Sequence, residues 1–321
     1  MTRLLIVAPN WLGDAVMALP AIADLRRALP EATIAITAKP AVASLFGMVR
    51  DVDEMIEKGA GRLAADIGLL LPNSFRSALD LVRAGIPQRW GYRTDCRGAL
   101  LTRGVSAPAP GLHQVEYYQH LVRALGFPNG PAQPRLDVTP EMRAAGARVL
   151  AGAGWDGTAP LAALAPGGAY GSAKRWPPAL FAALARELAS DGVCAVIVGT
   201  AADEPTSREI VAALGSARAM MVDVVGRTDV ATLAGVLAHA RALVANDSGV
   251  MHLGAALGLP IAALFGPTDE RLTAPRTASV HAVLTHSVWC RPCMLRECPL
   301  DHRCMRGIAV SEVASAARRM M

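Results

Sequence analysis

Aromatic side chains are scarce in this sequence, and so are charged ones. Phe, Trp and Tyr make up 4% of the 321 residues and charged residues 18%, whereas hydrophobic residues reach 52%. So large an apolar fraction excludes a disordered chain. The few aromatics and the modest net charge of +5 also argue against a nucleic-acid-binding protein.

Long hydrophobic runs are missing as well. No segment holds about 20 consecutive apolar residues, the length that crosses a bilayer. Residues 1–8 contain one basic residue, Arg3, and no cleavage site of small residues follows them. We therefore predict a strand there instead of a signal peptide, and we expect a cytoplasmic protein.

Two common nucleotide-binding fingerprints are also absent. The sequence has no GxGxxG followed by an acidic residue at the usual spacing, which disfavours a dehydrogenase. It has no Gly-Lys-Ser/Thr either, which excludes a P-loop. The length fits two domains of about 150 residues each.

Short apolar runs alternate with segments of helical periodicity throughout the chain. This alternation predicts βαβ units around a parallel sheet, once in each half, and so an α/β fold. Four prolines in 127–140 indicate a hinge, and we place the domains at 1–155 and 156–321. The expected strands are 4–8, 33–37, 52–56, 67–71, 161–165, 194–198, 242–245 and 261–264; the expected helices are 15–29, 75–84, 113–125, 140–150, 178–190, 204–214, 229–239, 249–257 and a closing helix at 310–319.

Three motifs follow predicted strands, where ligands of α/β proteins bind. The first is Asn10-Trp11-Leu12-Gly13-Asp14. Gly13 permits a tight turn at the start of a helix. Asp14 is then either a cap or first-turn carboxylate, or a general base that takes the proton of an attacking hydroxyl.

The second motif, residues 166–176, is rich in glycine and ends in Lys174-Arg175-Trp176. Backbone N–H groups of such a turn, Gly168 included, suit a phosphate, and Lys174 and Arg175 add positive charge. The alternative is a plain βα loop with a surface lysine.

The third motif is Asn246-Asp247-Ser248-Gly249-Val250-Met251-His252. Ser248 and Gly249 supply N–H groups at a helix N-terminus, which is a natural seat for phosphate. Asp247 either accepts a hydroxyl or caps the helix. His252 either reaches a phosphate or packs in the core.

The segment 70–104 is locally basic. It forms either a solvated face or a docking surface for a polyanion. Its arginines are Arg76, Arg83, Arg89, Arg93, Arg97 and Arg103, against Asp80 and Asp95.

Four of the six cysteines cluster near the end of the chain, at Cys290, Cys293, Cys298 and Cys304. In a cytosolic protein such spacing suggests a structural zinc site before a disulfide. Reduced thiols and a redox pair remain open alternatives. Cys96 and Cys194 are isolated and are expected to be packed.

Taken in order, the three motifs resemble those of the ADP-heptose:lipopolysaccharide heptosyltransferases, glycosyltransferase family nine. The segment 265–269, Phe-Gly-Pro-Thr-Asp, adds to the resemblance, which runs over nearly the whole chain. Lys-Arg-Trp-Pro and the cysteine-rich end look more like the second heptosyltransferases than the first. The resemblance implies a GT-B fold, with two Rossmann-like domains facing a central cleft.

The resemblance also implies roles for individual residues. Asp14 matches the catalytic base of an inverting displacement, and Lys174 matches the lysine that holds the donor diphosphate. The donor ADP-heptose would be bound by Gly168, Lys174, Arg175, Asp203, Thr228, Asp247, Ser248, Gly249 and His252.

The N-terminal half would bind the acceptor, the lipid A inner core, at the cytoplasmic face of the inner membrane. The candidate residues are Asn10, Trp11, Arg76, Arg93 and Arg97. No cofactor is expected, because Lys174 and helix N-termini can stabilise the leaving diphosphate. Asp51-Val52-Asp53 spells a metal-binding Asp-x-Asp, but it precedes a strand far in sequence from the donor loops. The alternatives are another nucleotide-sugar transferase of this fold and a non-catalytic binding module.

Overall fold

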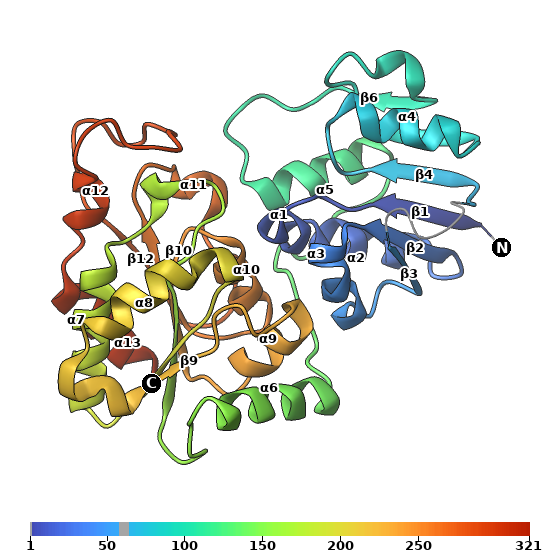
Figure 1. The fold of residues 1–321 in the computed structure, drawn as a ribbon. Helices are drawn as coiled ribbons and strands as arrows, with labels where there is room; N and C mark the ends of the chain where they lie inside the picture. Colours follow the sequence, from blue (N-terminus) through green and yellow to red (C-terminus); the bar gives the residue numbers. More distant parts are fainter. Residues whose placement is uncertain (1, 58–63) are drawn as a thin grey trace. The chain divides into compact units, whose positions relative to one another are not determined.

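The computed structural model describes residues 2–57 and 64–321; Met1, the first residue of the segment 1–8 considered above, lies outside them. The chain divides into two compact units, Met1–Asp137 and Val138–Met321. Each unit holds a six-stranded parallel sheet of the same strand order, β3-β2-β1-β4-β5-β6 in the first and β12-β11-β10-β7-β8-β9 in the second (Figure 1). This is the doubly wound order of Rossmann-like domains, so the predicted α/β class is confirmed.

The elements of unit 1 follow the predicted alternation, with additions. Its strands are β1 (Arg3–Val7), β2 (Thr33–Ala38), β3 (Glu54–Glu57), β4 (Ile67–Leu70), β5 (Gln88–Tyr92) and β6 (Arg103–Val105). Its α-helices are α1 (Leu12–Met17), α2 (Leu19–Ala28), α3 (Pro40–Ala43), α4 (Phe75–Arg83) and α5 (Gln114–Ala124), with short 3-10 turns at Ser44–Met48 and Gly98–Leu100. The predicted helix 15–29 is divided at Ala18, two residues before Pro20, because proline lacks an N–H to continue the ladder.

Strands β5 and β6 were not predicted. Their sequences carry Arg89 and Arg103 and show little apolar periodicity, so they read as part of the basic segment. The side chains of Leu5 and Val7 pack against Ala78 and Leu81 of α4, which covers that face of the sheet.

Unit 2 repeats the plan. Its strands are β7 (Leu161–Ala165), β8 (Cys194–Ile197), β9 (Met221–Asp223), β10 (Ala242–Asn246), β11 (Ile261–Phe265) and β12 (His281–Thr285). Its α-helices are α6 (Pro140–Gly152), α7 (Pro178–Ser190), α8 (Glu204–Ala212), α9 (Val230–Leu237), α10 (Gly249–Ala256), α11 (Glu270–Thr273), α12 (Arg303–Arg306) and α13 (Val310–Met320), and 3-10 turns lie at Ser172–Lys174, Ala201–Asp203 and Gly215–Met220.

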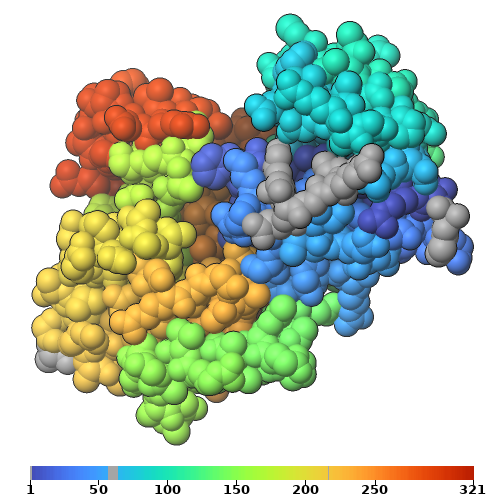
Figure 2. Space-filling model, turned by 45° about the vertical axis from the view of Figure 1, so that its right-hand side comes forward, coloured from blue at the N-terminus to red at the C-terminus, as the bar shows by residue number. Residues whose placement is uncertain are grey.

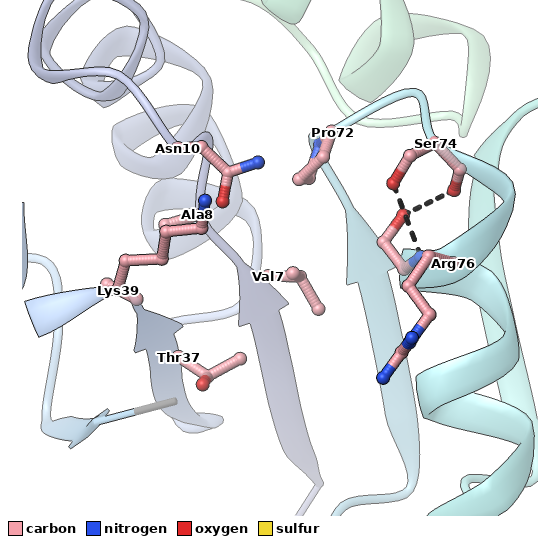
Figure 3. A pocket seen from close by; sticks show the side chains of 10 residues that line it. Val7, Ala8, Asn10, Thr37, Lys39, Pro72, Ser74 and Arg76 are labelled. Atoms are coloured by element: carbon pink, nitrogen blue, oxygen red, sulfur yellow. Dashed lines mark hydrogen bonds between the residues drawn. The ribbon is translucent and has the colours of Figure 1, made fainter. Parts of the chain in front are cut away.

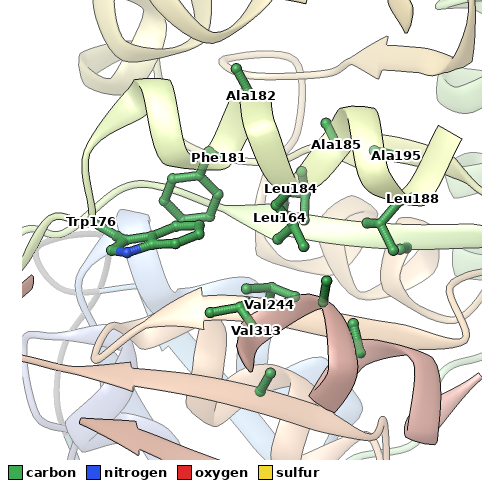
Figure 4. Close-up of a cluster of buried hydrophobic side chains, with 14 of the residues drawn as sticks. Leu164, Trp176, Phe181, Ala182, Leu184, Ala185, Leu188, Ala195, Val244 and Val313 are labelled. Carbon is green, nitrogen blue, oxygen red and sulfur yellow. The ribbon is translucent and has the colours of Figure 1, made fainter. Parts of the chain in front are cut away.

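One core cluster of unit 2 joins α7 and α13 over the strands (Figure 4). The Trp176 ring packs edge-on against Phe181, 4.9 Å between centroids, and Val313 of α13 belongs to the same cluster. Trp176 therefore belongs to the core, and it fixes the backbone of its neighbours Lys174 and Arg175.

The structure divides the chain earlier than the expected boundary at 155/156. Helix α6, which we expected in the first domain, packs against α9 of unit 2. A Cβ on Gly146 would lie 2.2 Å from the carbonyl carbon of Gly235, so the two helices cross at a pair of glycines. That close crossing assigns α6 to the second unit.

Candidate functional site

The predicted loops lie where the fold favours ligands. In a doubly wound sheet the crevice forms outside the carboxyl ends of the two strands at which the order reverses. These strands are β1 and β4 in unit 1, and β7 and β10 in unit 2. The second and third motifs follow β7 and β10, and the first follows β1.

An ionic network links three loops of unit 2. Lys174 Nζ donates to Asp247 Oδ2 at 2.5 Å, and Thr268 Oγ1 donates to the same oxygen at 2.8 Å. Asp247 and Thr268 are buried, and Lys174 is largely so. The network therefore holds the β7, β10 and β11 loops together and keeps an ammonium group at the crevice.

Asn246 fixes the same loops through the backbone. Its Oδ1 accepts from the Trp176 N–H at 3.1 Å, and its Nδ2 donates to the carbonyls of Pro166 and Gly167. The Trp176 indole in turn donates to the Ile308 carbonyl at 3.1 Å. The Lys-Arg-Trp motif is thus clamped from both sides, which limits the positions that Lys174 can take.

The cysteine-rich segment supports the second motif. The Arg296 carbonyl accepts from the Ala173 N–H, and the Tyr170 hydroxyl donates to the Met294 carbonyl. A Cβ on Gly171 would lie 2.2 Å from the Arg296 oxygen, so only glycine fits there. The Tyr170 ring lies 4.6 Å from Lys174 Nζ, a cation–π distance.

The N-terminus of α10 carries unused hydrogen-bonding capacity. Ser248 precedes the helix in extended conformation, and its buried Oγ has no partner among the described residues. His252, one turn later, is buried. Orphan N–H groups and a buried hydroxyl at a helix N-terminus suit an anionic ligand.

Asp203 has a structural task. Its Oδ2 accepts from the Thr200 N–H and hydroxyl in a capping box before α8, and its carboxylate fills the space beside Gly167. Arg175 lies 3.8 Å from its other oxygen, Oδ1. Thr228 is half-buried in the β9–α9 loop, where the Gly226 N–H donates to the Gly199 carbonyl.

Asp14 lies in the first turn of α1 and is half-buried. The residue that caps this helix is Trp11, so Asp14 is not the cap that we considered. The hydroxyl of Tyr118 donates to Asp14 Oδ1 at 3.5 Å. Burial, followed by the charge of Asp14, raises the pKa of Tyr118 well above its usual value, so the phenol stays protonated.

A pocket of about 220 Å³ opens beside Asn10 at the carboxyl ends of β1, β2 and β4. Lys39 borders it on the β2 side and Arg76 on the α4 side (Figure 3). Trp11 next to Asn10 is 60% exposed. The pocket therefore gathers two of the predicted acceptor residues, Asn10 and Arg76.

The other two predicted acceptor arginines lie in different environments, one exposed and one buried. Arg93 is exposed at the end of β5 and packs its stem against Gly104. Arg97 is 0% exposed and donates to the carbonyls of Pro72, Ser74 and Tyr92, so the structure corrects its assignment from the acceptor surface to the core. The spacing of arginines along the sequence could not distinguish these two environments.

The described structure does not arrange the four clustered cysteines as the predicted zinc site. Among residues 2–57 and 64–321, no group of three or more His, Cys, Asp or Glu is arranged to hold a metal ion. The orange-red segment around them lies at the surface of unit 2 (Figure 2), where Trp289 is 80% exposed. Cys96, expected to be packed, is exposed, whereas burial raises the pKa of Cys194 to about 11.

The Asp-x-Asp sequence serves the fold. Asp53 Oδ2 accepts from the Ile34 N–H at 2.7 Å and from Arg26 at 2.5 Å. These hydrogen bonds lower the pKa of the Asp53 carboxyl, the backbone bond most of all. The carboxylate thus joins β2 and β3.

The fold and the three loops define a class: an α/β glycosyltransferase with two Rossmann-like units. The family model for glycosyltransferase family 9 (heptosyltransferase) matches residues 56–303. The chain belongs to glycosyltransferase family 9, which confirms the resemblance drawn from the motifs, and it is an enzyme of that class.

Named relatives agree with this assignment. The chain is 32% identical to lipopolysaccharide heptosyltransferase 2 of Salmonella typhimurium and 31% identical to that of Escherichia coli, over 85% of each chain in both cases. Its structure is similar to that of the E. coli ADP-heptose lps heptosyltransferase II, with a TM-score of 0.86 and 28% identity, over 99% of this chain and 98% of that one.

Four residues at these sites were not singled out by sequence reasoning. Thr268 was noted only as part of the motif that carried the resemblance, and Thr37, Lys39 and Tyr118 were not noted. Thr37 and Lys39 follow a predicted strand, so the rule that ligands bind at strand ends could have found them. Tyr118 lies within a helix 104 residues from Asp14, and no local signal links the two.

Proposed function

We propose that this enzyme transfers heptose from ADP-heptose to the inner core of lipopolysaccharide, onto the first heptose. The observation that carries the donor side is the network of Lys174, Asp247 and Thr268 beside the N-terminus of α10. The named relatives are lipopolysaccharide heptosyltransferases, which supports the choice of sugar and acceptor.

Unit 2 is the proposed donor domain. The ammonium group of Lys174 and the N–H groups at Ser248 and Gly249 would neutralise the diphosphate as it leaves. Gly168 of the same loop is proposed to offer its backbone N–H to the diphosphate; a Cβ there would meet no protein atom closer than 3.7 Å. Asp203, Thr228, Arg175 and His252 are proposed to border the rest of the donor.

Unit 1 is the proposed acceptor domain, with Asp14 as the general base. Its carboxylate would take the proton of the attacking hydroxyl while ADP departs from the opposite face of the sugar, which inverts the anomeric centre. The protonated Tyr118 hydroxyl would hold Oδ1 and leave the other oxygen for the acceptor. This step requires no metal and no covalent intermediate.

The proposed place of action is the cytoplasm, with peripheral contact at the inner membrane that carries the acceptor. Among the described residues no helix combines the length and apolar character needed to cross a bilayer. Contact with the membrane would then come from the acceptor and from surface residues.

Release of ADP from ADP-heptose tests the proposal. Wild-type enzyme is expected to release ADP with an acceptor that already carries one heptose, and only slowly with a heptose-free acceptor. The reverse preference would assign it to the first heptosyltransferase step. No acceptor-dependent release with either acceptor would refute heptose transfer and favour another nucleotide sugar.

A further inference from the structure

The pocket of unit 1 has the composition of an anion site. Its polar lining residues are Asn10, Thr37, Lys39, Ser74, Arg76 and Ser77. The ten lining residues are all described, and none of them is a carboxylate. Two cationic side chains from different elements, Lys39 after β2 and Arg76 in α4, therefore border a concave space with no acidic side chain in its wall.

Both cationic side chains have N–H donors that could bind a ligand. Among the contacts of the described residues, Lys39 has no ion-pair partner. Arg76 uses its Nε for an exposed pair with Asp80 at 2.9 Å, and its terminal nitrogens make no hydrogen bond in the described part of the chain. An exposed helical pair of this kind contributes little to stability, so a ligand can compete with it.

A buried hydroxyl adds an independent sign of a ligand. Thr37 at the end of β2 is 3% exposed, and its Oγ1 has no partner among residues 2–57 and 64–321. Figure 3 shows Thr37 in the wall of the pocket, between β1 and Lys39. Burying a hydroxyl without a partner costs free energy, and an oxygen ligand in the pocket would remove that cost.

The size suits one group of a larger molecule. A volume of about 220 Å³ is far above the roughly 10–15 Å³ that one water requires. It is below the roughly 300–1,000 Å³ of pockets that enclose a whole small ligand. Trp11 and Phe75 are exposed next to the lining residues Asn10 and Arg76, and they offer flat apolar surface for a sugar ring.

We propose that this pocket binds an anionic oxygen group of the acceptor, a carboxylate or a phosphate ester, between Lys39 and Arg76 with Thr37 Oγ1 as a third donor. The inference rests on the proposed transfer reaction and specifies how unit 1 holds its substrate. The subsite is distinct from Asp14, because Asp14 is not among the lining residues.

Transfer kinetics test the subsite. Lys39→Met and Arg76→Gln should each raise the acceptor KM about tenfold or more, because each removes a charge-assisted hydrogen bond to the anion, and should leave the donor KM unchanged. The matched control is Arg83→Gln, which removes the same charge from the exposed end of the same helix and should have no effect. An equal rise with Arg83→Gln would overturn the proposal.

Modified acceptors identify the anion. The acceptor's carboxylates can be reduced to alcohols, or its phosphates removed. Only one of these two treatments should raise the acceptor KM of the wild type. With that neutralised acceptor, Lys39→Met should raise the KM no further. If Lys39→Met weakens both neutralised acceptors as much as the intact one, the pocket does not bind an anion.

Binding without turnover separates this inference from the proposed function. Glucuronate and inorganic phosphate serve as probes, and the melting temperature of the full chain is the readout, because a ligand of the folded state stabilises it. At least one probe should stabilise the wild type more than the double variant Lys39→Met/Arg76→Gln, even if no heptose transfer is found. Equal stabilisation of both proteins, or none of either, would overturn the subsite.

Thr37→Val distinguishes a ligand-binding role from a purely structural one, because the two roles predict different changes in melting temperature and acceptor KM. Removal of an unpartnered buried hydroxyl should keep or raise the melting temperature of the unliganded protein. The same change should raise the acceptor KM. A lower melting temperature with an unchanged KM would mean that Thr37 serves only the fold.

Discussion

The two units share a strand order but differ at the point where that order reverses. In unit 2 the crevice loops are joined by a buried ion pair between Lys174 and Asp247. In unit 1 the corresponding edge opens into a pocket whose cations, Lys39 and Arg76, face no acidic lining residue. One fold thus provides a preorganised charge in one unit and an open, positively charged pocket in the other.

The difference suits the two proposed substrates. A diphosphate leaving group gains charge during the reaction, so a lysine held in one position by Asp247 and Tyr170 can act without reorganisation. An acceptor only has to be bound and oriented, and exposed side chains around a pocket suffice for that. Each prediction below alters one side of this comparison.

On the donor side, Lys174→Met should have the largest effect. Loss of the ammonium group should lower kcat/KM for the donor by about a hundredfold or more, as for other preorganised groups that stabilise developing charge. The acceptor KM should change little. Steady-state rates with each substrate varied in turn would check this, and an equal loss toward both substrates would break the assignment of the two units.

Arg97→Met should act mainly by lowering the free energy of unfolding of unit 1, and only weakly on catalysis. The buried guanidinium donates to three backbone carbonyls and to Ser77, and its removal should cost about 3 kcal/mol of the free energy of unfolding. Arg76→Gln should change stability by less than about 0.5 kcal/mol, because that side chain is exposed. Urea unfolding of both variants measures the contrast, and equal losses would contradict it.

Substitution of two glycines of the second motif should have different effects on stability and on donor binding. Gly171→Ala forces a Cβ to within 2.2 Å of the Arg296 oxygen, so it should lower the melting temperature by several degrees and raise the donor KM. Gly168→Ala meets nothing closer than 3.7 Å, so it should leave the melting temperature unchanged and raise the donor KM alone, by about fivefold to tenfold. An unchanged donor KM for Gly168→Ala would remove it from the donor site.

Asp53→Asn should have the smallest effect on catalysis, with no change in the donor or acceptor KM, and should cost about 1 kcal/mol of stability. Because the pKa of Asp53 is lowered in the folded state, its contribution is present above its unfolded pKa of about 3.9 and is lost as the pH falls through the folded value. Unfolding at pH 7 and at acid pH should therefore show the difference shrinking. A rate that depends on added metal and on Asp53 would contradict the structural role.

The sequence predicted most of the strands that carry apolar runs and the loops that follow them, but it missed β9 and β12 of unit 2. β7 and α7 agree with the prediction residue for residue, because a buried run and a proline at the helix start are both local signals. The domain boundary lay beyond such signals, because the Gly146–Gly235 crossing that ties α6 to unit 2 joins residues far apart in the chain.

In the site, too, features with a local sequence signal could be predicted, and features that depend on residues far apart in the chain could not. Asp14, Lys174 and Asp247 lie in the segments that follow β1, β7 and β10, so their positions could be inferred. The burial of Arg97 could not, because it depends on carbonyls contributed by residues 72–74 and by β5. The cluster of cysteines likewise had the spacing of a metal site, and the described structure does not bring its thiols together in that way.

The most direct test of the account compares wild type with Asp14→Asn in acceptor-dependent ADP release from ADP-heptose. The variant keeps the size of the side chain and its place in the first turn of α1, so the melting temperature should be nearly unchanged. We predict a fall in kcat of about a hundredfold or more, as expected when a general base is lost. Turnover by Asp14→Asn at the wild-type rate would contradict the central claim that unit 1 supplies the base.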